Sequence, residues 1–313
     1  MNKKKIFALL PFKNEAHNFE TFFQNIYDVV DGVIGFDDGS LDNSSQIFSD
    51  YGGTMLKYDG ISNWGKGGQR LVRNRLLEFG RELGGTHFLV LDADEFISTD
   101  LSPFARDEIL SLNAGEALAI PWVNLWKSFD ARCGSNTPWE PKLKDFAFAD
   151  DGHLSYPMGL IHFSRTPVSP SEKTWRKTQN PGVVIHTQFA QWNRTKLKQA
   201  WYRCLELVHT QQKPRHINFT YDITKERRVR NIVDLNQEWA TNVIFPVDIS
   251  IGEADWHANE VMDWFEEFGI EFFERLDIWD IELFREKYIL ETGAHPRKPL
   301  YPSFARKLYA KVR

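Results

Sequence analysis

One short apolar segment that ends in three carboxylates constrains this chain more than any other feature. Residues 86–96 read THFLVLDADEF. An apolar run of this length is typical of a strand buried on both faces of a parallel sheet, and ligands of such sheets gather at the carboxyl ends of the strands. Asp92 and Asp94 follow the run two residues apart, so their side chains point to the same side in extended chain. Two converging carboxylates repel each other unless a cation lies between them, and oxygen ligands favour Mg²⁺ or Mn²⁺. The segment therefore predicts a site for a metal ion and a diphosphate.

The first part of the chain alternates predicted strands with predicted helices. Apolar runs and helical spacing of apolar residues predict strands at 6–10, 32–36, 53–56, 86–91 and 117–123, and helices at 19–30, 42–51 and 68–83. Such alternation indicates parallel βαβ units with right-handed crossovers. We therefore expect an α/β fold with a mostly parallel sheet flanked by helices, in which residues 1–125 form the nucleotide-binding half.

The rest of the chain has a different character. Residues 126–184 are rich in Pro, Gly, Trp and Asp and poorly periodic, which predicts ordered, substrate-facing loops. A short strand is expected at 183–185, a helix at 195–210, and broken helices in the acidic, aromatic stretch 256–288. We therefore expect residues 126–215 to complete a domain spanning 1–215. Residues 216–313 are expected to form a helical, aromatic-rich C-terminal extension.

Charge and cysteine content narrow the class of protein. The net charge of −5 argues against a nucleic-acid binder, which normally carries a dominant basic face. The two cysteines, Cys133 and Cys204, form no disulfide framework and no metal-binding spacing, which favours a reducing, cytoplasmic location. No apolar stretch is long enough to span a membrane. Residues 297–313 are basic and contain no acid, so the end of the chain suits peripheral contact with the cytoplasmic membrane face; a solvated tail is the alternative.

Two further segments carry polar groups at the ends of predicted strands. Residues 37–44 read DDGSLDNS, and taken alone they are a strand–turn–helix connection in which Gly39 permits the turn. Asp38 could still accept hydrogen bonds from a base or a ribose. Residues 65–74 form a glycine-rich lead into a helix, and their cations suit phosphates, although the segment is neither a Walker loop nor a GxGxxG motif.

Four segments together resemble a known family. LPFKNE at 10–15, DGVIGFDDGSLD at 31–42, Arg73-Asn74 and LDADE at 91–95 appear in this order. The set resembles the family 2 glycosyltransferases with the GT-A fold, in particular the bacterial KNE…DDGS.D…LDADE subgroup, and covers roughly the first third of the chain.

The resemblance implies a metal-dependent, inverting glycosyltransferase of the hexosyltransferase type. Its donor would be a nucleotide-diphosphate sugar and its acceptor a glycan or glycolipid hydroxyl in surface polysaccharide, lipopolysaccharide or capsule biosynthesis. The Gln-x-x-Arg-Trp signature of processive polymerases is missing, which favours transfer of single sugars.

The resemblance also implies roles for individual residues. Asp38 would bind the nucleobase, and Lys13 stands where many relatives place an aromatic residue. The residues expected to bind the nucleotide and its diphosphate are Pro11, Lys13, Glu15, Asp38, Lys66, Arg73 and Asp92. Asp92 and Asp94 would be the metal-binding pair, with His186 completing the shell around Mn²⁺ or Mg²⁺. A hydrogen-bonded core histidine is the alternative for His186.

The general base is the weakest part of this pattern. An inverting enzyme needs an acid to deprotonate the acceptor hydroxyl, and the family's usual Glu-Asp pair is absent here. The candidates are Asp145, Asp150, Asp151 and Glu172. Asp151 is preferred because Asp-Asp-Gly marks a tight, exposed turn; all four could equally be ordinary loop acids.

Two other classes of protein share parts of this pattern. A haloacid-dehalogenase-type phosphatase also places Asp-x-Asp after an apolar strand, but that chemistry prefers Thr or Val after the second Asp, where this chain has Glu95. The motif also follows the fourth predicted strand rather than the first. A glycan-binding protein that kept the fold without turnover is the second alternative, because no base is evident.

Overall fold

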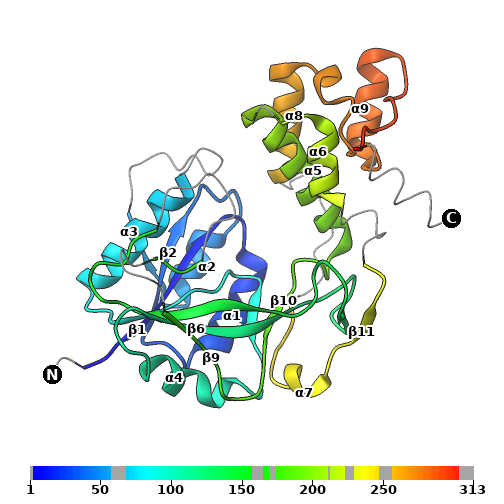
Figure 1. Ribbon diagram of the computed structural model, residues 1–313. Helices are drawn as coiled ribbons and strands as arrows, with labels where there is room; N and C mark the ends of the chain where they lie inside the picture. Colours follow the sequence, from blue (N-terminus) through cyan, green and yellow to red (C-terminus); the bar gives the residue numbers. More distant parts are fainter. Residues whose placement is uncertain are drawn as a thin grey trace. The chain divides into compact units, whose positions relative to one another are not determined.

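The computed structural model describes residues 3–57, 68–156, 165–168, 174–210, 212–222, 229–246 and 256–302 (Figure 1). The chain forms two compact units. The first comprises Met1–Ser135, Trp139–Phe189 and Val233–Asp248, and the second comprises Asn136–Pro138, Ala190–Ile232 and Ile249–Arg313.

The first unit is an α/β fold built on a nine-stranded sheet with the order β3-β2-β1-β4-β8-β6-β10-β5, and β9 pairs with β6 beside this path. Its parallel half contains β3 (Thr54–Met55), β2 (Gly32–Asp37), β1 (Ile6–Phe12) and β4 (His87–Leu89). The connecting helices are α1 (Ala16–Ile26), α2 (Ser44–Asp50) and α3 (Gly68–Glu82). The predicted βαβ units and the mostly parallel sheet flanked by helices are therefore confirmed.

Alternate residues of β1 enter two separate hydrophobic cores, as the pleat requires. Leu10 lies in the core with Phe19 of α1 and Phe48 of α2, and Leu9 lies in the core with Val72 of α3. The parallel half is therefore covered by helices on both faces. Close packing explains Gly35 in β2, because a Cβ there would lie 2.4 Å from the Phe48 ring.

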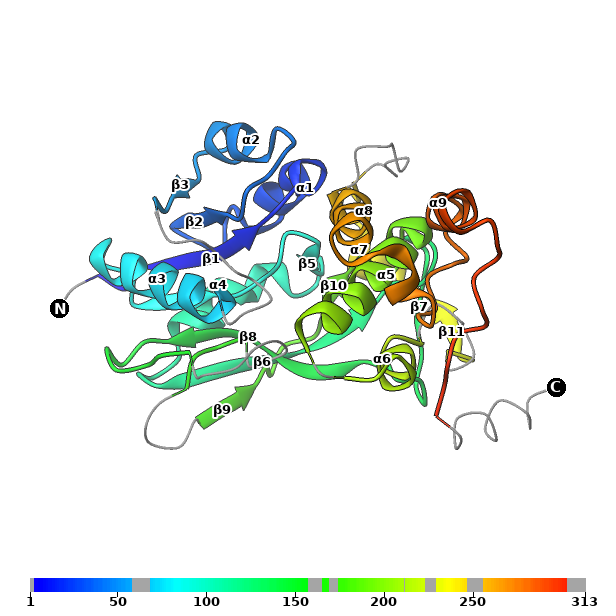
Figure 2. The same cartoon turned by 90° about the horizontal axis from the view of Figure 1, so that it is seen from above.

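The second half of the sheet corrects one expectation. Residues 126–184 were expected to be loops, but they contain β7 (Ala131–Cys133), β8 (Lys142–Ala149) and β9 (Thr174–Lys177). Strand β8 lies between β4 and β6 (Glu116–Asn124), antiparallel to both. Its last four residues alternate Phe with Ala and are all buried, so they lack the polar face that marks a strand in sequence. Figure 2 shows β6, β8 and β9 running alongside one another.

Several shorter elements complete the first unit. Strand β10 (Val184–His186) pairs parallel with β6 and antiparallel with β5 (Glu95–Ile97). Helix α4 (Ser102–Leu110) follows β5, and the later segment holds β11 (Ile232–Asp234), which pairs with β7, and α7 (Gln237–Ala240). The predicted strand that ends at His186 is confirmed.

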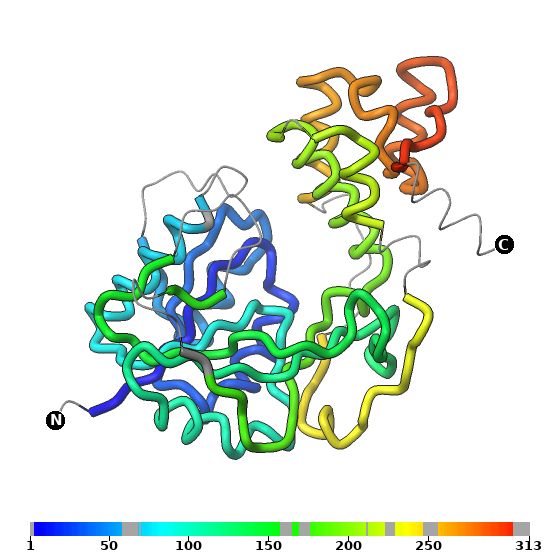
Figure 3. Tube along the Cα trace, in the orientation of Figure 1, coloured from blue at the N-terminus to red at the C-terminus, as the bar shows by residue number. Residues whose placement is uncertain are grey.

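The second unit is helical (Figure 3). It contains α5 (Trp192–His209), α6 (Pro214–Thr220), α8 (Trp256–Phe268), the 3₁₀ helix η3 (Ile270–Phe273) and α9 (Glu282–Thr292). Gly269 and Gly293 have φ of 79° and 70° and end α8 and α9, as glycine in this region commonly does. The predicted helical C-terminal region with breaks is confirmed; the domain division at residue 215 stays a prediction. None of the helices in the described part of the chain combines the length and apolarity needed to cross a bilayer.

Candidate functional site

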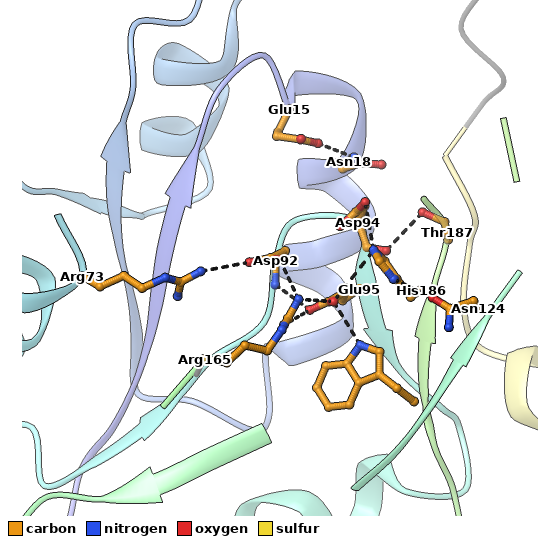
Figure 4. Close-up of polar contacts among 11 residues, drawn as sticks. Glu15, Asn18, Arg73, Asp92, Asp94, Glu95, Asn124, Arg165, His186 and Thr187 are labelled. Carbon is orange, nitrogen blue, oxygen red and sulfur yellow. Dashed lines mark hydrogen bonds and ion pairs between the residues drawn. The ribbon is translucent and has the colours of Figure 1, made fainter. Parts of the chain in front are cut away.

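The acidic segment forms a tight turn between β4 and β5. The Glu95 amide donates to the Asp92 carbonyl at 3.0 Å, and the Asp92 amide donates to Glu95 Oε2 at 2.9 Å. These reciprocal bonds bury the Glu95 side chain completely beneath the turn. The Asp94 carbonyl accepts from the Thr187 amide at 3.0 Å and from Thr187 Oγ1 at 3.1 Å (Figure 4). Asp94 is thereby held beside the end of β10.

His186 is the last residue of β10 and meets the acids through sheet register. It lies opposite Glu95 in the antiparallel pair with β5 and opposite Asn124 in the parallel pair with β6. Its Nε2 atom lies 3.4 Å from Asp94 Oδ2 and 3.9 Å from Glu95 Oε1. Its Nδ1 atom lies 3.0 Å from Asn124 Oδ1. Because an amide oxygen only accepts, this pairing puts the proton on Nδ1 and leaves the Nε2 lone pair facing the acids.

Three side chains here could hold a metal ion. Asp94, Glu95 and His186 each offer a ligand atom, and these atoms all lie within 4.8 Å of one another. Carboxylate and imidazole ligands suit Mn²⁺, and a histidine ligand whose second nitrogen is hydrogen-bonded is the usual arrangement at metal sites. Glu95 already accepts from Trp122 Nε1 at 3.0 Å and from Arg165. Asp94 and His186 are therefore better placed than Glu95 to bind a metal ion.

Asp92 is turned toward two arginines rather than toward His186. Its Oδ2 atom accepts from Arg165 Nη2 at 2.6 Å, and its Oδ1 atom lies 3.6 Å from Arg73 Nη2. Burial raises the pKa of Asp92, but the guanidinium groups of Arg165 and Arg73 outweigh it and hold the pKa below the usual value. Of the predicted metal ligands, the structure thus brings Asp94 and His186 together and gives Asp92 a different set of partners.

Arg165 is a site residue that sequence reasoning missed. It ion-pairs with both Asp92 and the buried Glu95. Its carbonyl accepts from the Tyr156 hydroxyl at 3.0 Å, and the Tyr156 amide donates to Asn74 Oδ1 at 2.8 Å, which ties this segment to α3. Arg165 lies in no motif or periodic segment. Its role follows from the burial of Glu95, since a fully buried glutamate needs a cation, and that burial is seen only in the structure.

Lys13 and Glu15, two of the predicted nucleotide-binding residues, lie on a turn that contacts the turn after β2. Asn14, with φ of 55°, accepts the Leu41 amide at 2.6 Å on its side-chain oxygen, and the Glu15 amide donates to Ser44 Oγ at 2.8 Å. The turn that carries Lys13 and Glu15 is thereby joined to the turn after β2.

Asp38 and Pro11 lie beside these turns. The Asp38 amide donates to the Phe12 carbonyl at 2.9 Å, and Pro11 pairs with Phe36 across β1 and β2. Asp37 organises the turn itself, because its carboxylate accepts the Ser40 amide at 2.7 Å. The nucleotide contacts of Pro11, Lys13, Glu15 and Asp38 stay predictions, and Lys66 lies outside the described residues.

The structure separates Asp151 from the other predicted site residues. Ala149 of β8 pairs with His87 at the start of β4, and the Asp150 amide donates to the Thr86 carbonyl. Asp151 therefore lies beyond the amino end of β4, whereas Asp92 follows its carboxyl end, more than about 20 Å away at the usual rise per strand residue. Its Oδ1 atom accepts the His153 amide at 2.7 Å, which makes it a turn-forming residue. Asp151, the base preferred from the sequence, thus lies away from Asp92 because β8 runs antiparallel to β4.

Asp145 is the better placed acid among those described. Ala147 of β8 pairs with Leu89 at the end of β4, so Asp145 lies two residues farther toward the carboxyl end, where Asp92 follows. Its Oδ2 atom accepts from Thr166 Oγ1 at 2.7 Å, and Thr166 follows Arg165 in the chain. Asp150 ion-pairs with Arg81 at 2.7 Å, and Glu172 lies outside the described residues.

Comparisons with known proteins gave structural likeness only. No family model matches the chain, and no curated protein matches it. Glucosyl-3-phosphoglycerate synthase from Mycobacterium tuberculosis with Mn²⁺, UDP and glucosyl-3-phosphoglycerate is 18% identical over 50% of this chain and 61% of its own, with a TM-score of 0.34. The same enzyme with UDP is 19% identical over 40% of this chain and 45% of its own, with a TM-score of 0.29. Mannosyl-3-phosphoglycerate synthase from Rubrobacter xylanophilus is 19% identical over 40% of this chain and 41% of its own, with a TM-score of 0.28. The chain thus spans less than two thirds of each of these proteins, and likeness at this level carries no conclusion about its activity or ligands.

Proposed function

We propose that this chain is a metal-dependent glycosyltransferase that moves one sugar from a nucleotide-diphosphate donor to an acceptor hydroxyl. The observation that carries the proposal is the position of His186. Its Nε2 atom faces the Asp94 carboxylate at 3.4 Å, and Asn124 holds its Nδ1 atom. This arrangement lies at the carboxyl end of β4, where the motifs that resemble the glycosyltransferases also converge.

Asp94 and His186, with Glu95 within reach, would hold Mn²⁺ or Mg²⁺. A divalent ion bound there supplies a Lewis acid that neutralises charge on the departing nucleoside diphosphate.

Arg73 and Arg165 also bind the donor diphosphate in this proposal. Arg73 and Arg165 both contact Asp92, which sets their guanidinium groups beside the acidic turn. Planar guanidinium groups match phosphate oxygens in pairs of hydrogen bonds, so they are suited to bind a diphosphate. On the nucleotide side, Asp38 binds the base, and Pro11, Lys13 and Glu15 line the pocket.

Asp145 takes the role of general base in this proposal. Its carboxylate, oriented by Thr166, removes the proton from the acceptor hydroxyl as the oxygen attacks the anomeric carbon. Attack from the face opposite to the leaving diphosphate inverts that carbon. The acceptor is a glycan or glycolipid of surface polysaccharide, lipopolysaccharide or capsule synthesis. A cytoplasmic location and membrane contact through the basic C-terminus complete the proposal; residues 303–313 lie outside the described residues.

Nucleotide release is the measurement that tests this function. The full chain is incubated with a panel of nucleotide sugars in Mn²⁺ or in a chelator, beside Asp94→Asn and the exposed control Asp28→Asn. Metal-dependent release that Asp94→Asn loses and Asp28→Asn keeps supports the proposal. Phosphate release from a simple monoester without nucleotide turnover contradicts it and indicates a phosphatase. Sugar or nucleotide binding without release indicates a glycan-binding protein.

A further inference from the structure

The site also contains a half-buried lysine, Lys144, near the start of β8. Its Nζ atom lies over the Trp122 ring, 5.8 Å from the ring centre. Within the part of the chain that the structure describes, Lys144 has this aromatic contact and neither a hydrogen bond nor an ion pair. Its neighbour on the same strand, Lys142, is exposed and lies 3.9 Å from Glu140.

Trp122 connects Lys144 to the acidic turn. The indole Nε1 donates to Glu95 Oε1 at 3.0 Å, and the Arg165 guanidinium lies over the same ring at 5.2 Å. Pairing of β8 with β4 places residue 144 at the carboxyl end of β4, where Asp92 lies. Lys144 and Arg165 are therefore two cations on one aromatic platform, directly beside the candidate metal ligands.

Arg165 and Lys144 differ in the groups that compensate their positive charges. Arg165 is paired with both Asp92 and Glu95, so these carboxylates are already engaged. Burial lowers the pKa of Lys144 and outweighs the Glu95, Asp92 and Asp94 carboxylates, which raise it, while Arg165 lowers it further. A cation–π contact compensates only part of the cost of removing an ammonium group from water. A bound anion would therefore supply the hydrogen-bonding partner that Lys144 lacks among the described residues.

We propose that Lys144 binds a phosphate group of the ligand that occupies this edge of the sheet. The inference rests on the proposed function for the identity of that ligand: the phosphate belongs either to the donor diphosphate or to a phosphorylated acceptor. An ammonium group is a compact, strongly hydrated charge, which favours a phosphate over the neutral hydroxyls of a sugar. With a divalent ion at Asp94 and His186, this edge carries excess positive charge that a phosphate neutralises.

Calorimetric titration with two phosphate probes tests the proposal. Lys144→Gln removes the charge and keeps much of the length, and Lys142→Gln is the matched control on the same strand. Inorganic pyrophosphate with Mn²⁺ stands in for the donor diphosphate, and glycerol 3-phosphate with Mn²⁺ stands in for a phosphorylated acceptor. Glycerol is the uncharged counterpart, and thermal melting confirms that each variant is folded.

We expect Lys144→Gln to weaken binding of one phosphate probe about tenfold to a hundredfold, with Lys142→Gln unchanged. Loss for pyrophosphate assigns the group to the donor, and loss for glycerol 3-phosphate assigns it to the acceptor. Equal affinities in all three proteins, equal loss in both variants, or no binding of either probe to the native chain would overturn the proposal. Lys144-dependent binding without nucleotide release from any sugar donor would retain the phosphate site and refute the glycosyltransferase.

Discussion

The imidazole of His186 faces the Asp94 carboxylate across 3.4 Å, although His186 ends β10 and Asp94 lies far earlier in the chain, in the turn before β5. Sheet register brings them together, because β10 pairs with β5 directly after the acidic turn. The Thr187 hydrogen bonds to the Asp94 carbonyl fix the distance from the other side. Strand pairing and the Thr187 hydrogen bonds thus position the pair.

Asp94→Ala should abolish Mn²⁺ binding and leave the fold intact. The change removes one carboxylate from a cluster of like charges, so the apo protein loses repulsion and little packing. Isothermal titration with Mn²⁺ measures the affinity, and Asp28→Ala, on an exposed turn, is the control. Unchanged affinity in Asp94→Ala would refute the assigned site.

Asn124→Leu should weaken Mn²⁺ binding about tenfold to a hundredfold, because the second nitrogen of His186 loses its partner and the ring its fixed tautomer. Asn124→Asp keeps an acceptor at the same place and should retain most of the affinity. If both variants lose the same amount, Asn124 acts through packing rather than through His186.

Arg165→Leu should destabilise the protein by about 3–5 kcal/mol, because it leaves Glu95 buried without a cation. Urea unfolding measures the loss. The double variant Arg165→Leu/Glu95→Gln should recover much of it, since no buried charge then remains unpaired. A double variant as unstable as the single one would show that Arg165 contributes through packing alone.

Asp31 should make stability depend on pH in the acid range. Burial raises its pKa, but hydrogen bonds from the Ile6 amide and Arg106 outweigh burial and hold the pKa below the usual value. A depressed pKa gives stability that is present above the unfolded value of about 4 and is lost as the pH falls through the folded value.

Asp31→Asn should therefore be about 1 kcal/mol less stable than the native chain above about pH 5, with the difference vanishing in acid. Urea unfolding across the pH range provides the measurement. A difference that persists below about pH 3 would mean that the Asp31 charge is not its source.

Much of the fold could be predicted because its signals are local. The strands and helices of the parallel half carry apolar runs or helical spacing within a few residues, and the structure contains each of them. Strand β8 was missed because its buried end alternates two apolar residue types, and burial by neighbours on both sides cannot be read from the segment itself. The turn at Asp151 was read correctly from Asp-Asp-Gly, but only the antiparallel pairing of β8 with β4 shows at which end of the sheet that turn lies.

The sequence alone determined which polar groups follow strand ends: Asp92 and Asp94 after one buried run, and His186 after another. Tertiary structure decided which partner each of these side chains contacts. Asp94 turns to His186, while Asp92 turns to Arg73 and Arg165. The physical reason is that partner choice for a charged side chain depends on which groups the sheet brings within a few ångströms. Arg165 and Lys144 lie at the site because segments that are distant in the chain pair with each other. That pairing cannot be predicted from the spacing of residues along the chain.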